Sequence, residues 1–397
     1  MARVSTSRSR VTGPSSKRIL HVMESTIGGT RRHLRDVARV QCEAGHEVTV
    51  VAACLRMPEV RQDLAELERL GVHTFELPMV RSIRPWVDWK HLRQLEGLLR
   101  ERQPEVVHTH SSKAGVLGRL ASRRTGIGAR VHTPHTFSFF FSEMFGAGKR
   151  TIFRQIETRL GRATHRLVAV GEGEGETIRA SGVVDPGIVR VVPNGIDPAP
   201  FRAVAPAARA GLGVPEGVLL LATVGLLNVA KGQDLAIEAL ARTETGGAHL
   251  LLVGHGEEEP ALRELAERLG VAERVHWLGW REDVPALLGA ADACLLPSRW
   301  EGLPYIVLEA MAAGRPVLAS AVDGARDLIE EGRTGFLFEP ANVAAMARAI
   351  GQFAGLPAPA RASLGAAGAE RITEHYDLDA MRRGLDTVYE EALEACP

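Results

Sequence analysis

The sequence has few aromatic residues and few cysteines. Phe, Trp and Tyr make up 5% of its 397 residues, and no CxxC pair or disulfide-like spacing relates its 4 cysteines. So sparse a set of cysteines argues against a fold held by disulfide bonds and favours a reducing cytoplasm as the location.

Long apolar runs are also absent. No run of about 18 apolar residues occurs, so the sequence predicts no segment that crosses a membrane. Residues 1–16 are rich in Ser and Arg and contain no apolar stretch, which predicts a disordered basic tail rather than a signal peptide.

The chain has no net charge, but its two halves differ. Residues 1–199 carry 31 Lys and Arg against 20 Asp and Glu, whereas residues 200–397 carry 17 against 28. The first half is therefore basic by 11 charges and the second half acidic by 11. This asymmetry favours an anionic partner for the first half, although two surfaces can also differ without any partner.

What the sequence does contain is a repeated alternation of short apolar strands and helices. This alternation predicts an α/β fold with parallel sheets, and a chain of 397 residues suits two domains. We expect a first domain at residues 17–200, a linker at 201–216, a second domain at 217–375, and a last helix at 376–397 that returns to the first domain.

Two glycines, Gly28 and Gly29, follow the first predicted strand at residues 18–23 and precede a helix. Glycine at such a turn lets the backbone come close to a ligand. The full GxGxxG spacing of dinucleotide-binding proteins is missing, which argues against a nicotinamide dehydrogenase.

Four histidines lie near the ends of two predicted strands, at residues 106–110 and 130–133. A helix is expected between these strands, at residues 116–125. Imidazoles in such a group could ligate a metal, but no acidic or Cys partner stands at ligand spacing. We favour hydrogen bonding at the carboxyl edge of the sheet, where ligands of open parallel sheets bind. The four are His108, His110, His132 and His135.

The segment at residues 81–90 mixes cations with two tryptophans, Trp86 and Trp89. This combination suits the headgroup zone of a bilayer. More often, though, such residues simply cover a helix, and the membrane contact is kept as the alternative interpretation.

The most distinctive stretch, at residues 297–314, predicts a strand end, a Gly/Pro loop and a helix whose first turn suits Pro304. A helix start attracts anions such as phosphate, and the carboxylates of Glu301 and Glu309 suit a ligand rich in hydroxyl groups. The alternative is that Glu301 is solvated and Glu309 serves the helix surface. The DxD at residues 377–379 is expected to cap the last helix rather than hold a metal.

Together these residues resemble the retaining glycosyltransferases of family 4, the glycosyl transferases group 1. The most specific marks are Glu301 and Glu309 within EGLPYIVLEAMAAGRPV, and PNGID at residues 193–197. HTHSSKAG at residues 108–115 and HTPH at residues 132–135 are similar to the branch that builds capsules, exopolysaccharides and O-antigens. The resemblance covers nearly the whole chain and implies the GT-B fold, two Rossmann-like domains facing across a cleft.

The resemblance also implies a role for each matching residue. The catalytic residues would be His135 near the anomeric centre of the sugar, Lys231 on the donor diphosphate and Glu301 facing the sugar hydroxyls. The donor would further contact Gly28, Gly29, the main-chain amides of Tyr305, Ile306 and Val307, and, at the nucleotide ribose, Glu309. The acceptor side would hold His110, Lys113 and Thr136. No metal and no other cofactor is required.

Two positions depart from the family pattern. Leu226 stands where the family has an arginine that, with the lysine, neutralises charge on the leaving diphosphate. Lys113, Arg31 and Arg299 are candidates to replace that arginine. Gly171 stands where the family often has serine, which is a milder departure.

The activity implied is transfer of a hexose from a nucleotide-diphosphate sugar, with a UDP-sugar favoured, to a hydroxyl of a lipid-linked or oligosaccharide acceptor. Configuration would be retained, and the product would serve cell-surface polysaccharide synthesis. The protein would be cytoplasmic and would contact the inner face of an anionic cell membrane peripherally. No nucleic acid is expected as a partner. The alternatives are a nucleotide-sugar epimerase of the same fold and, because of Leu226, a non-catalytic sugar-nucleotide-binding protein.

Overall fold

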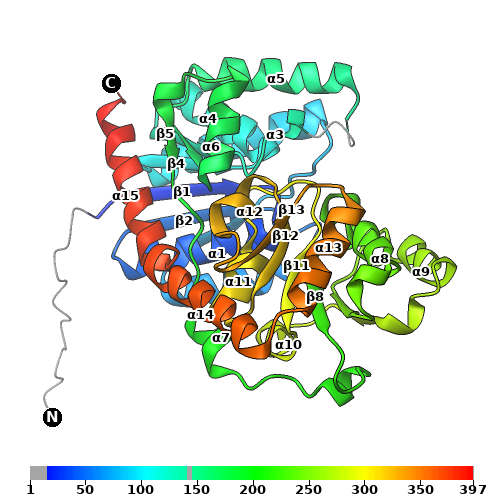
Figure 1. Cartoon of the computed structure of the whole chain (residues 1–397). Coiled ribbons are helices and arrows are strands. Elements are labelled where there is room, and N and C mark those ends of the chain that lie inside the picture. The colour runs from blue at the N-terminus through cyan, green and yellow to red at the C-terminus, as the bar shows by residue number, and fades with distance from the viewer. Residues whose placement is uncertain (1–15, 141–144, 397) are drawn as a thin grey trace, which may run out of the picture.

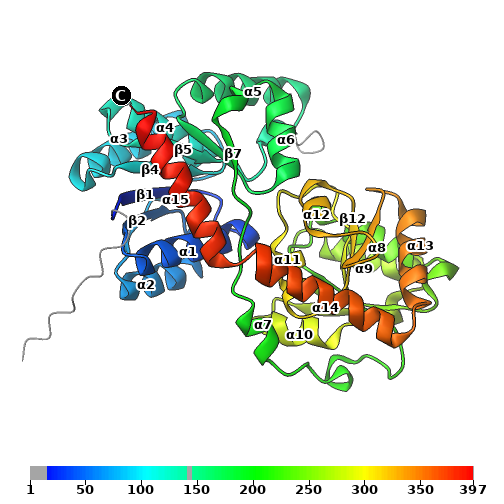
Figure 2. The same cartoon turned by 60° about the vertical axis from the view of Figure 1, so that its left-hand side comes forward.

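The computed structural model describes residues 16–140 and 145–396, so residues 1–15 of the predicted tail lie outside the described part. Its strands form two parallel sheets, each in a body of its own with helices on both faces (Figure 1). The two bodies are seen apart in Figure 2. This architecture confirms the predicted α/β class with two Rossmann-like domains.

The first sheet has seven parallel strands in the order β3-β2-β1-β4-β5-β6-β7. These strands are β1 (Arg18–Met23), β2 (Glu47–Ala52), β3 (His73–Glu76), β4 (Val106–His110), β5 (Ala129–Thr133), β6 (Arg166–Ala169) and β7 (Val189–Val191). Its helices are α1 (Gly28–Glu43), α2 (Val60–Leu70), α3 (Pro85–Arg102), α4 (Ser112–Thr125), α5 (Ala147–Gly161) and α6 (Glu172–Ser181).

The second sheet has six parallel strands in the order β10-β9-β8-β11-β12-β13. These strands are β8 (Leu220–Val224), β9 (His249–Val253), β10 (Val275–Gly279), β11 (Ala293–Leu296), β12 (Val317–Ser320) and β13 (Gly335–Phe338). The helices from the linker onward are α7 (Ala199–Ala203), α8 (Gln233–Leu240), α9 (Glu259–Arg268), α10 (Val284–Ala290), α11 (Tyr305–Ala312), α12 (Asp323–Leu328), α13 (Val343–Ala354) and α14 (Ala358–His375).

The last helix, α15 (Leu378–Glu394), leaves the second body and lies against the first (Figure 2). Asp377 caps it, because its Oδ1 accepts a hydrogen bond of 2.6 Å from the Ala380 amide. The DxD at this point is therefore a helix cap, as expected. The inner face of α15, with Leu385 and Tyr389, packs into one apolar cluster with Val106 and Val131 of the first sheet.

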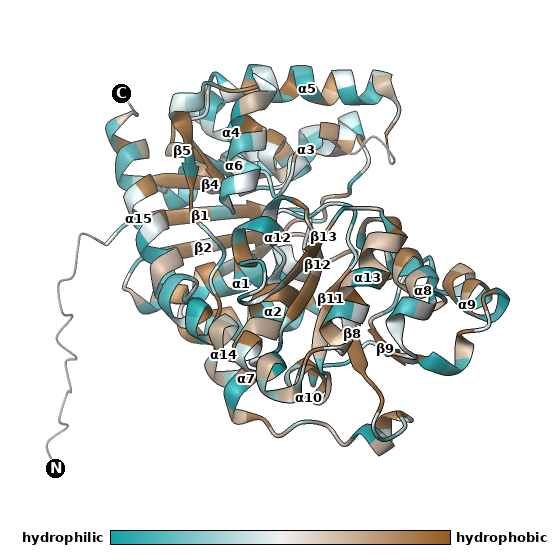
Figure 3. Cartoon of the chain, viewed as in Figure 1, coloured by the Kyte–Doolittle hydropathy of each residue, from teal (hydrophilic) through white to brown (hydrophobic). Residues whose placement is uncertain are grey.

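Apolar residues concentrate in the strands and on the helix faces turned toward them, as the brown colour of the central strands in Figure 3 shows. The strands β4, β9, β11 and β12 are buried along their whole length, as expected of parallel strands covered on both faces. Among the helices of the described residues, none combines the length and the apolar composition that a membrane crossing needs.

Helix α4 begins at Ser112, four residues before the start predicted from sequence, residue 116. The prediction was wrong because it assigned Gly115 to a loop. In the structure Gly115 and Gly118 bring the helix close to the sheet. A Cβ on either would lie 2.5 Å from the side chain of His132 or Thr109. These glycines serve packing rather than a turn.

Candidate active site

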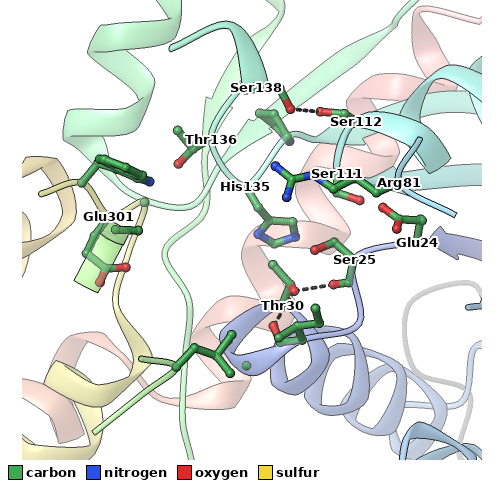
Figure 4. Close-up of a pocket in the computed structure, with 18 of the residues that line it drawn as sticks. Glu24, Ser25, Thr30, Arg81, Ser111, Ser112, His135, Thr136, Ser138 and Glu301 are labelled. Atoms are coloured by element: carbon green, nitrogen blue, oxygen red, sulfur yellow. Dashed lines mark hydrogen bonds between the residues drawn. The ribbon is translucent and has the colours of Figure 1, made fainter. Parts of the chain in front are cut away.

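Both sheets reverse their strand order beside their first strand, between β1 and β4 and between β8 and β11. In open parallel sheets, ligands bind at the carboxyl ends of the strands at such a point. A cavity of about 1560 Å³ lies between these two points and is lined from both bodies. Figure 4 shows His135 and Thr136 on one side of it and Glu301 on the other.

Glu301 lies in the loop between β11 and α11 and already holds Lys231. Its Oε1 accepts a hydrogen bond of 2.6 Å from Lys231 Nζ and one of 2.7 Å from Ser298 Oγ. The side chain of Glu301 is 11% exposed and that of Lys231 is 27% exposed. Both residues line the cavity, and their ion pair is largely shielded from solvent. The structure thus brings together a cation for a phosphate and a carboxylate for hydroxyl groups.

Glu309 lies farther along α11 and is paired across the cavity with Arg32 of α1. Arg32 Nη1 donates to Glu309 Oε1, and Arg32 Nε donates to Asp36 Oδ2 at 3.2 Å. The same guanidinium lies 5.3 Å from the centre of the Tyr305 ring. Burial raises the pKa of Glu309, and the Arg32 charge opposes that rise. Glu309, the residue expected to bind the ribose, therefore forms an ion pair with Arg32 that joins the two bodies.

The start of α11 presents two of the three main-chain amides expected from sequence. The Val307 amide donates to the Pro304 carbonyl at 3.1 Å, which leaves it less suited to a ligand. The amides of Tyr305 and Ile306 have no acceptor among the described residues, as the first amides of a helix usually have none. Pro304 precedes the helix as its N-cap residue.

The glycine pair after β1 brings the first body close to α11. Gly28 has a φ of +55°, a left-handed conformation that favours glycine. A Cβ on Gly29 would lie 3.2 Å from Cδ2 of Tyr305. Both glycines line the cavity, and the close approach that the structure shows is to Tyr305, while the expected approach to a ligand stays a prediction.

His135 and Thr136 have an unusual backbone. Their φ angles are +50° and +71°, in the left-handed region that residues with a Cβ seldom adopt. Glu174 of α6 holds this loop, because its two carboxylate oxygens accept hydrogen bonds from the amides of Thr136 at 2.6 Å and Val170 at 2.8 Å. Burial raises the pKa of Glu174 to about 7. Strain of this kind concentrates at functional sites.

His135 belongs to a buried group of histidines rather than standing alone. His135 Nε2 lies 3.3 Å from Nδ1 of His110, and His110 Nε2 lies 3.0 Å from Nδ1 of His21. His33 Nδ1 lies 2.9 Å from Oδ1 of Asn194. Burial lowers the pKa of all these histidines and keeps them neutral at pH 7.

Two sets of three histidines have ring nitrogens within 4.8 Å of one another and could hold a metal ion. The sets are His21, His108 and His110, and His33, His110 and His135. Hydrogen bonds between these rings and their neighbours already use most of the nitrogens. The rings thus hydrogen-bond to one another and to neighbouring side chains, and their expected contact with a ligand stays a prediction.

Lys113, expected on the acceptor side, lines the cavity from the first body, where it is neutralised by a carboxylate. Its Nζ donates to both carboxylate oxygens of Asp88 at 2.6 Å and to the Ser82 carbonyl at 2.9 Å. The other cations named as substitutes for the family arginine are similarly engaged, Arg31 with Asp63 and Arg299 with Asp234. Leu226 itself is half-buried and lines the cavity.

Gly171 has a structural explanation. A Cβ at this position would lie 2.4 Å from Oδ2 of Asp327, a residue of α12 in the second body. Asp327 accepts hydrogen bonds of 3.2 and 3.1 Å from the Gly173 amide. The glycine thus makes room for a carboxylate that caps α6 from the opposite body.

Sequence reasoning missed Arg32, Glu174, His21 and His33. Two signals were available for His21, because it lies in the first strand and its register places it beside His108. Arg32 and Glu309 are 277 residues apart, and no local pattern pairs them. Glu174 follows a strand in an ordinary helix start, where a carboxylate is common.

Comparison with known proteins agrees with this geometry. Residues 27–200 match the family model Glycosyltransferase Family 4, and residues 219–355 match Glycosyl transferases group 1. UDP-Gal:alpha-D-GlcNAc-diphosphoundecaprenol alpha-1,3-galactosyltransferase of Escherichia coli is 32% identical over 281 residues, which cover 68% of this chain and 71% of that protein. A D-inositol 3-phosphate glycosyltransferase of Salinispora tropica is 30% identical, with 92% and 81% covered.

Two solved structures share the fold along almost the whole chain. Anabaena HepE in complex with UDP and glucose has a TM-score of 0.79 at 22% identity, covering 94% of this chain and 98% of that one. Sucrose-phosphate synthase of Thermosynechococcus elongatus has a TM-score of 0.80 at 22% identity, covering 95% and 99%. Fold and relatives together define a glycosyltransferase of GT-B fold. More particularly, the chain belongs to glycosyltransferase family 4, and its second half to the glycosyl transferases group 1.

Proposed function

We propose that the protein transfers a hexose from a nucleotide-diphosphate sugar, preferably a UDP-sugar, to a hydroxyl of a lipid-linked acceptor, with retention of configuration. The reaction would serve cell-surface polysaccharide synthesis at the cytoplasmic face of the membrane. One observation carries the proposal: a single cavity is lined in the second body by Lys231, Glu301 and the start of α11, and in the first body by apolar side chains and cations.

On the donor side, Lys231 and the amides of Tyr305 and Ile306 would hold the diphosphate, while Glu301 and Glu309 would accept hydrogen bonds from the sugar and the ribose. The bond between the anomeric carbon and the diphosphate oxygen breaks, and charge develops on the diphosphate. Lys231 and the helix start stabilise that charge. The acceptor hydroxyl attacks the anomeric carbon from the same face, and its proton passes to a diphosphate oxygen.

On the acceptor side, apolar side chains and cations share one wall. The apolar residues are Phe139, Phe145, Ile152, Phe153 and Ile156, and the cations are Arg56, Arg81, Lys113 and Lys149. This mixture suits a lipid chain joined to a diphosphate. The Escherichia coli relative is named for an acceptor of this type.

The same wall continues onto the surface at the start of α3. Ile83 lines the cavity and is 63% exposed, and Trp86 and Trp89 are 83% and 55% exposed. The two tryptophans therefore do not cover a helix, which favours their interpretation as a membrane contact. Each Lys or Arg near an anionic surface would add roughly 1 kcal/mol.

The test measures UDP release from UDP-galactose with a GlcNAc-diphosphate-lipid acceptor, presented either in anionic vesicles or in detergent. We expect turnover that needs the acceptor, is faster in vesicles at low salt, and is abolished by Glu309→Gln. The matched control is Glu267→Gln, an exposed carboxylate of α9 that should leave turnover unchanged. Configuration is read by NMR of the product.

Each other outcome contradicts a named part of the proposal. Sugar conversion without acceptor would indicate an epimerase instead. Binding of UDP-galactose without any turnover would indicate a non-catalytic sugar-nucleotide-binding protein. An unchanged rate in Glu309→Gln would remove that residue from the donor site. Equal rates in vesicles and in detergent would contradict the membrane contact.

A further inference from the structure

A chain of hydrogen bonds connects His135 in the cavity to Tyr389 in the last helix. His21 Nε2 lies 2.8 Å from Oε1 of Gln41, whose Nε2 donates to Tyr389 Oη at 3.0 Å. Beyond it, Tyr389 Oη lies 2.8 Å from Nδ1 of His108, and His108 Nε2 lies 2.8 Å from Oγ1 of Thr133. We call the linked residues the histidine chain: His135, His110, His21, Gln41, Tyr389, His108 and Thr133.

The histidine chain is dry, and its histidines are neutral. Apart from His135, which lines the cavity, every member has an exposed fraction of 0%. Burial lowers the pKa of His21 to about 4 and lowers the pKa of His108, His110 and His135 well below the usual value. A neutral imidazole has one donor nitrogen and one acceptor nitrogen, so fixing one bond of such a chain fixes the next.

Gln41 sets the direction, because an amide is a donor at one end and an acceptor at the other. With Nε2 turned to Tyr389, its Oε1 must accept from His21 Nε2–H. His21 Nδ1 is then an acceptor and receives His110 Nε2–H, and His110 Nδ1 in turn receives His135 Nε2–H. His135 is left with an unprotonated Nδ1, for which the described residues offer no hydrogen-bond partner.

His33 supports the same direction. Asn194 Nδ2 donates to the Leu303 carbonyl at 3.2 Å, so its Oδ1 accepts from His33 Nδ1–H. His33 Nε2 is therefore an acceptor, and it is buried without a partner in the described part of the chain. Its ring centre lies 4.7 Å from that of His135. The His33 ring thus lies beside His135 without giving it a proton, and the lone pair of His110 Nδ1, 3.3 Å from His135 Nε2, favours a proton there.

We propose that Tyr389 and Gln41 are positioning residues that hold His135 in the Nε2–H tautomer, so that it presents a hydrogen-bond acceptor to the cavity. In this form His135 receives a hydrogen bond from a hydroxyl of the transferred sugar. The reversed chain would place a proton on Nδ1 and turn the acceptor into a donor. The catalytic consequence rests on the proposed function, but the tautomer itself does not.

The first test is a ¹⁵N–¹H NMR spectrum of the imidazoles in the ligand-free protein, with the His135 signals assigned by their loss in His135→Asn. We expect the Nε2–H tautomer in the wild type. Tyr389→Phe removes the acceptor for the Gln41 amide N–H, so the amide can rotate by 180° and exchange its oxygen and nitrogen. The direction of the chain would then reverse, and signals of the Nδ1–H tautomer of His135 should appear. The control is Tyr376→Phe, which loses a hydroxyl bonded at 3.2 Å to the Asp327 carbonyl outside the histidine chain and should leave His135 unchanged.

The second test is kinetic. Tyr389→Phe should lower kcat about fivefold, as expected for one hydrogen bond, and leave KM for the nucleotide sugar nearly unchanged. An Nδ1–H tautomer in the wild type would overturn the proposal, as would a Tyr389→Phe protein with the wild-type spectrum and kcat. If Tyr389→Phe does not fold, the wild-type spectrum alone decides. A wild type with the expected tautomer but no turnover refutes the proposed function and not the tautomer.

Discussion

Leu226 stands where the resemblance to family 4 leads us to expect an arginine, and none of the three cations considered as substitutes replaces its charge. Lys113, Arg31 and Arg299 are each bonded to a carboxylate. Of the donor-side residues expected from sequence, Lys231 alone is a cation, and it already shares its charge with Glu301.

We therefore predict that Leu226→Arg tightens binding of UDP about tenfold. A charge-assisted hydrogen bond contributes about 1.5–3 kcal/mol, and 1.4 kcal/mol corresponds to a factor of ten. Isothermal titration calorimetry with UDP measures the change, and Leu226→Met is the control of similar volume without charge. Equal affinity in the Arg and Met variants would mean that position 226 does not reach the diphosphate.

At the scale of single residues, the sequence predicted many of the residues that line the cavity. It did not predict their hydrogen bonds and ion pairs. The spacing of Glu301 and Glu309 placed one carboxylate in the loop before a helix and the other inside that helix, because helix and loop geometry are local. Lys231, 70 residues from Glu301, meets it when the second body folds, whereas Arg32, 277 residues from Glu309, meets it only when the two bodies come together.

Among the elements, α6 depends on the opposite body for its first hydrogen bonds. Its N-cap is Gly171, which has no side chain to accept them, and the carboxylate of Asp327 in α12 takes that place at the Gly173 amide. Helix α6 also carries Glu174, which holds the His135 loop. The contact of Asp327 with α6 therefore links the packing of the two bodies to the position of the His135 loop in the cavity.

Asp327→Ala should lower the free energy of unfolding by about 1 kcal/mol, the usual cost of a lost helix cap. It should also raise the radius of gyration in small-angle X-ray scattering, because the bodies lose a contact. Asp185→Ala is the control, since Asp185 caps the short turn Pro186–Ile188 within the first body with a bond of 2.8 Å to Gly187 N. An equal change in scattering for both variants would contradict an interdomain role.

The elements themselves were largely predictable, because hydrophobic period and turn residues act over a few positions. Strands β1 and β4 begin and end where the sequence placed them. The helix after β4 was predicted to begin too late because Gly115 can mean either a turn or a close approach to the sheet, and only the packed structure distinguishes these.

For the whole molecule, the decisive feature is the number of histidines buried in the first body. Burial lowers the pKa of eight histidines of this body, to about 4 for His21, His33 and His165, while the unfolded chain has the ordinary value of 6.5. The other five are His91, His108, His110, His132 and His135. Because the unfolded chain binds more protons between pH 6.5 and 4, stability must fall with pH through that window.

The size of this loss can be compared with the stability of an ordinary domain. A difference from 6.5 to about 4 corresponds to about 3 kcal/mol for each of His21 and His33, against a total of about 5–15 kcal/mol for a typical protein. Glu174 acts in the opposite sense. Its pKa is raised to about 7, so it adds stability as the pH falls from 7 to 4.5. Burial also raises the pKa of Glu24, Glu309 and Asp327, but these four carboxyls are outnumbered by the eight imidazoles.

We therefore predict that the first body unfolds on acidification between pH 6.5 and 4. The unfolding should take up several protons, which calorimetry in buffers of different ionisation enthalpy counts directly. Urea denaturation at pH 7.5 and 5.5 measures the loss of stability. His375, whose side chain is 58% exposed, supplies the control, because His375→Gln should leave the pH dependence unchanged. A stability that stays level from pH 7.5 to 5 would mean that these histidines are solvated, and the histidine chain could not then hold His135 in one tautomer.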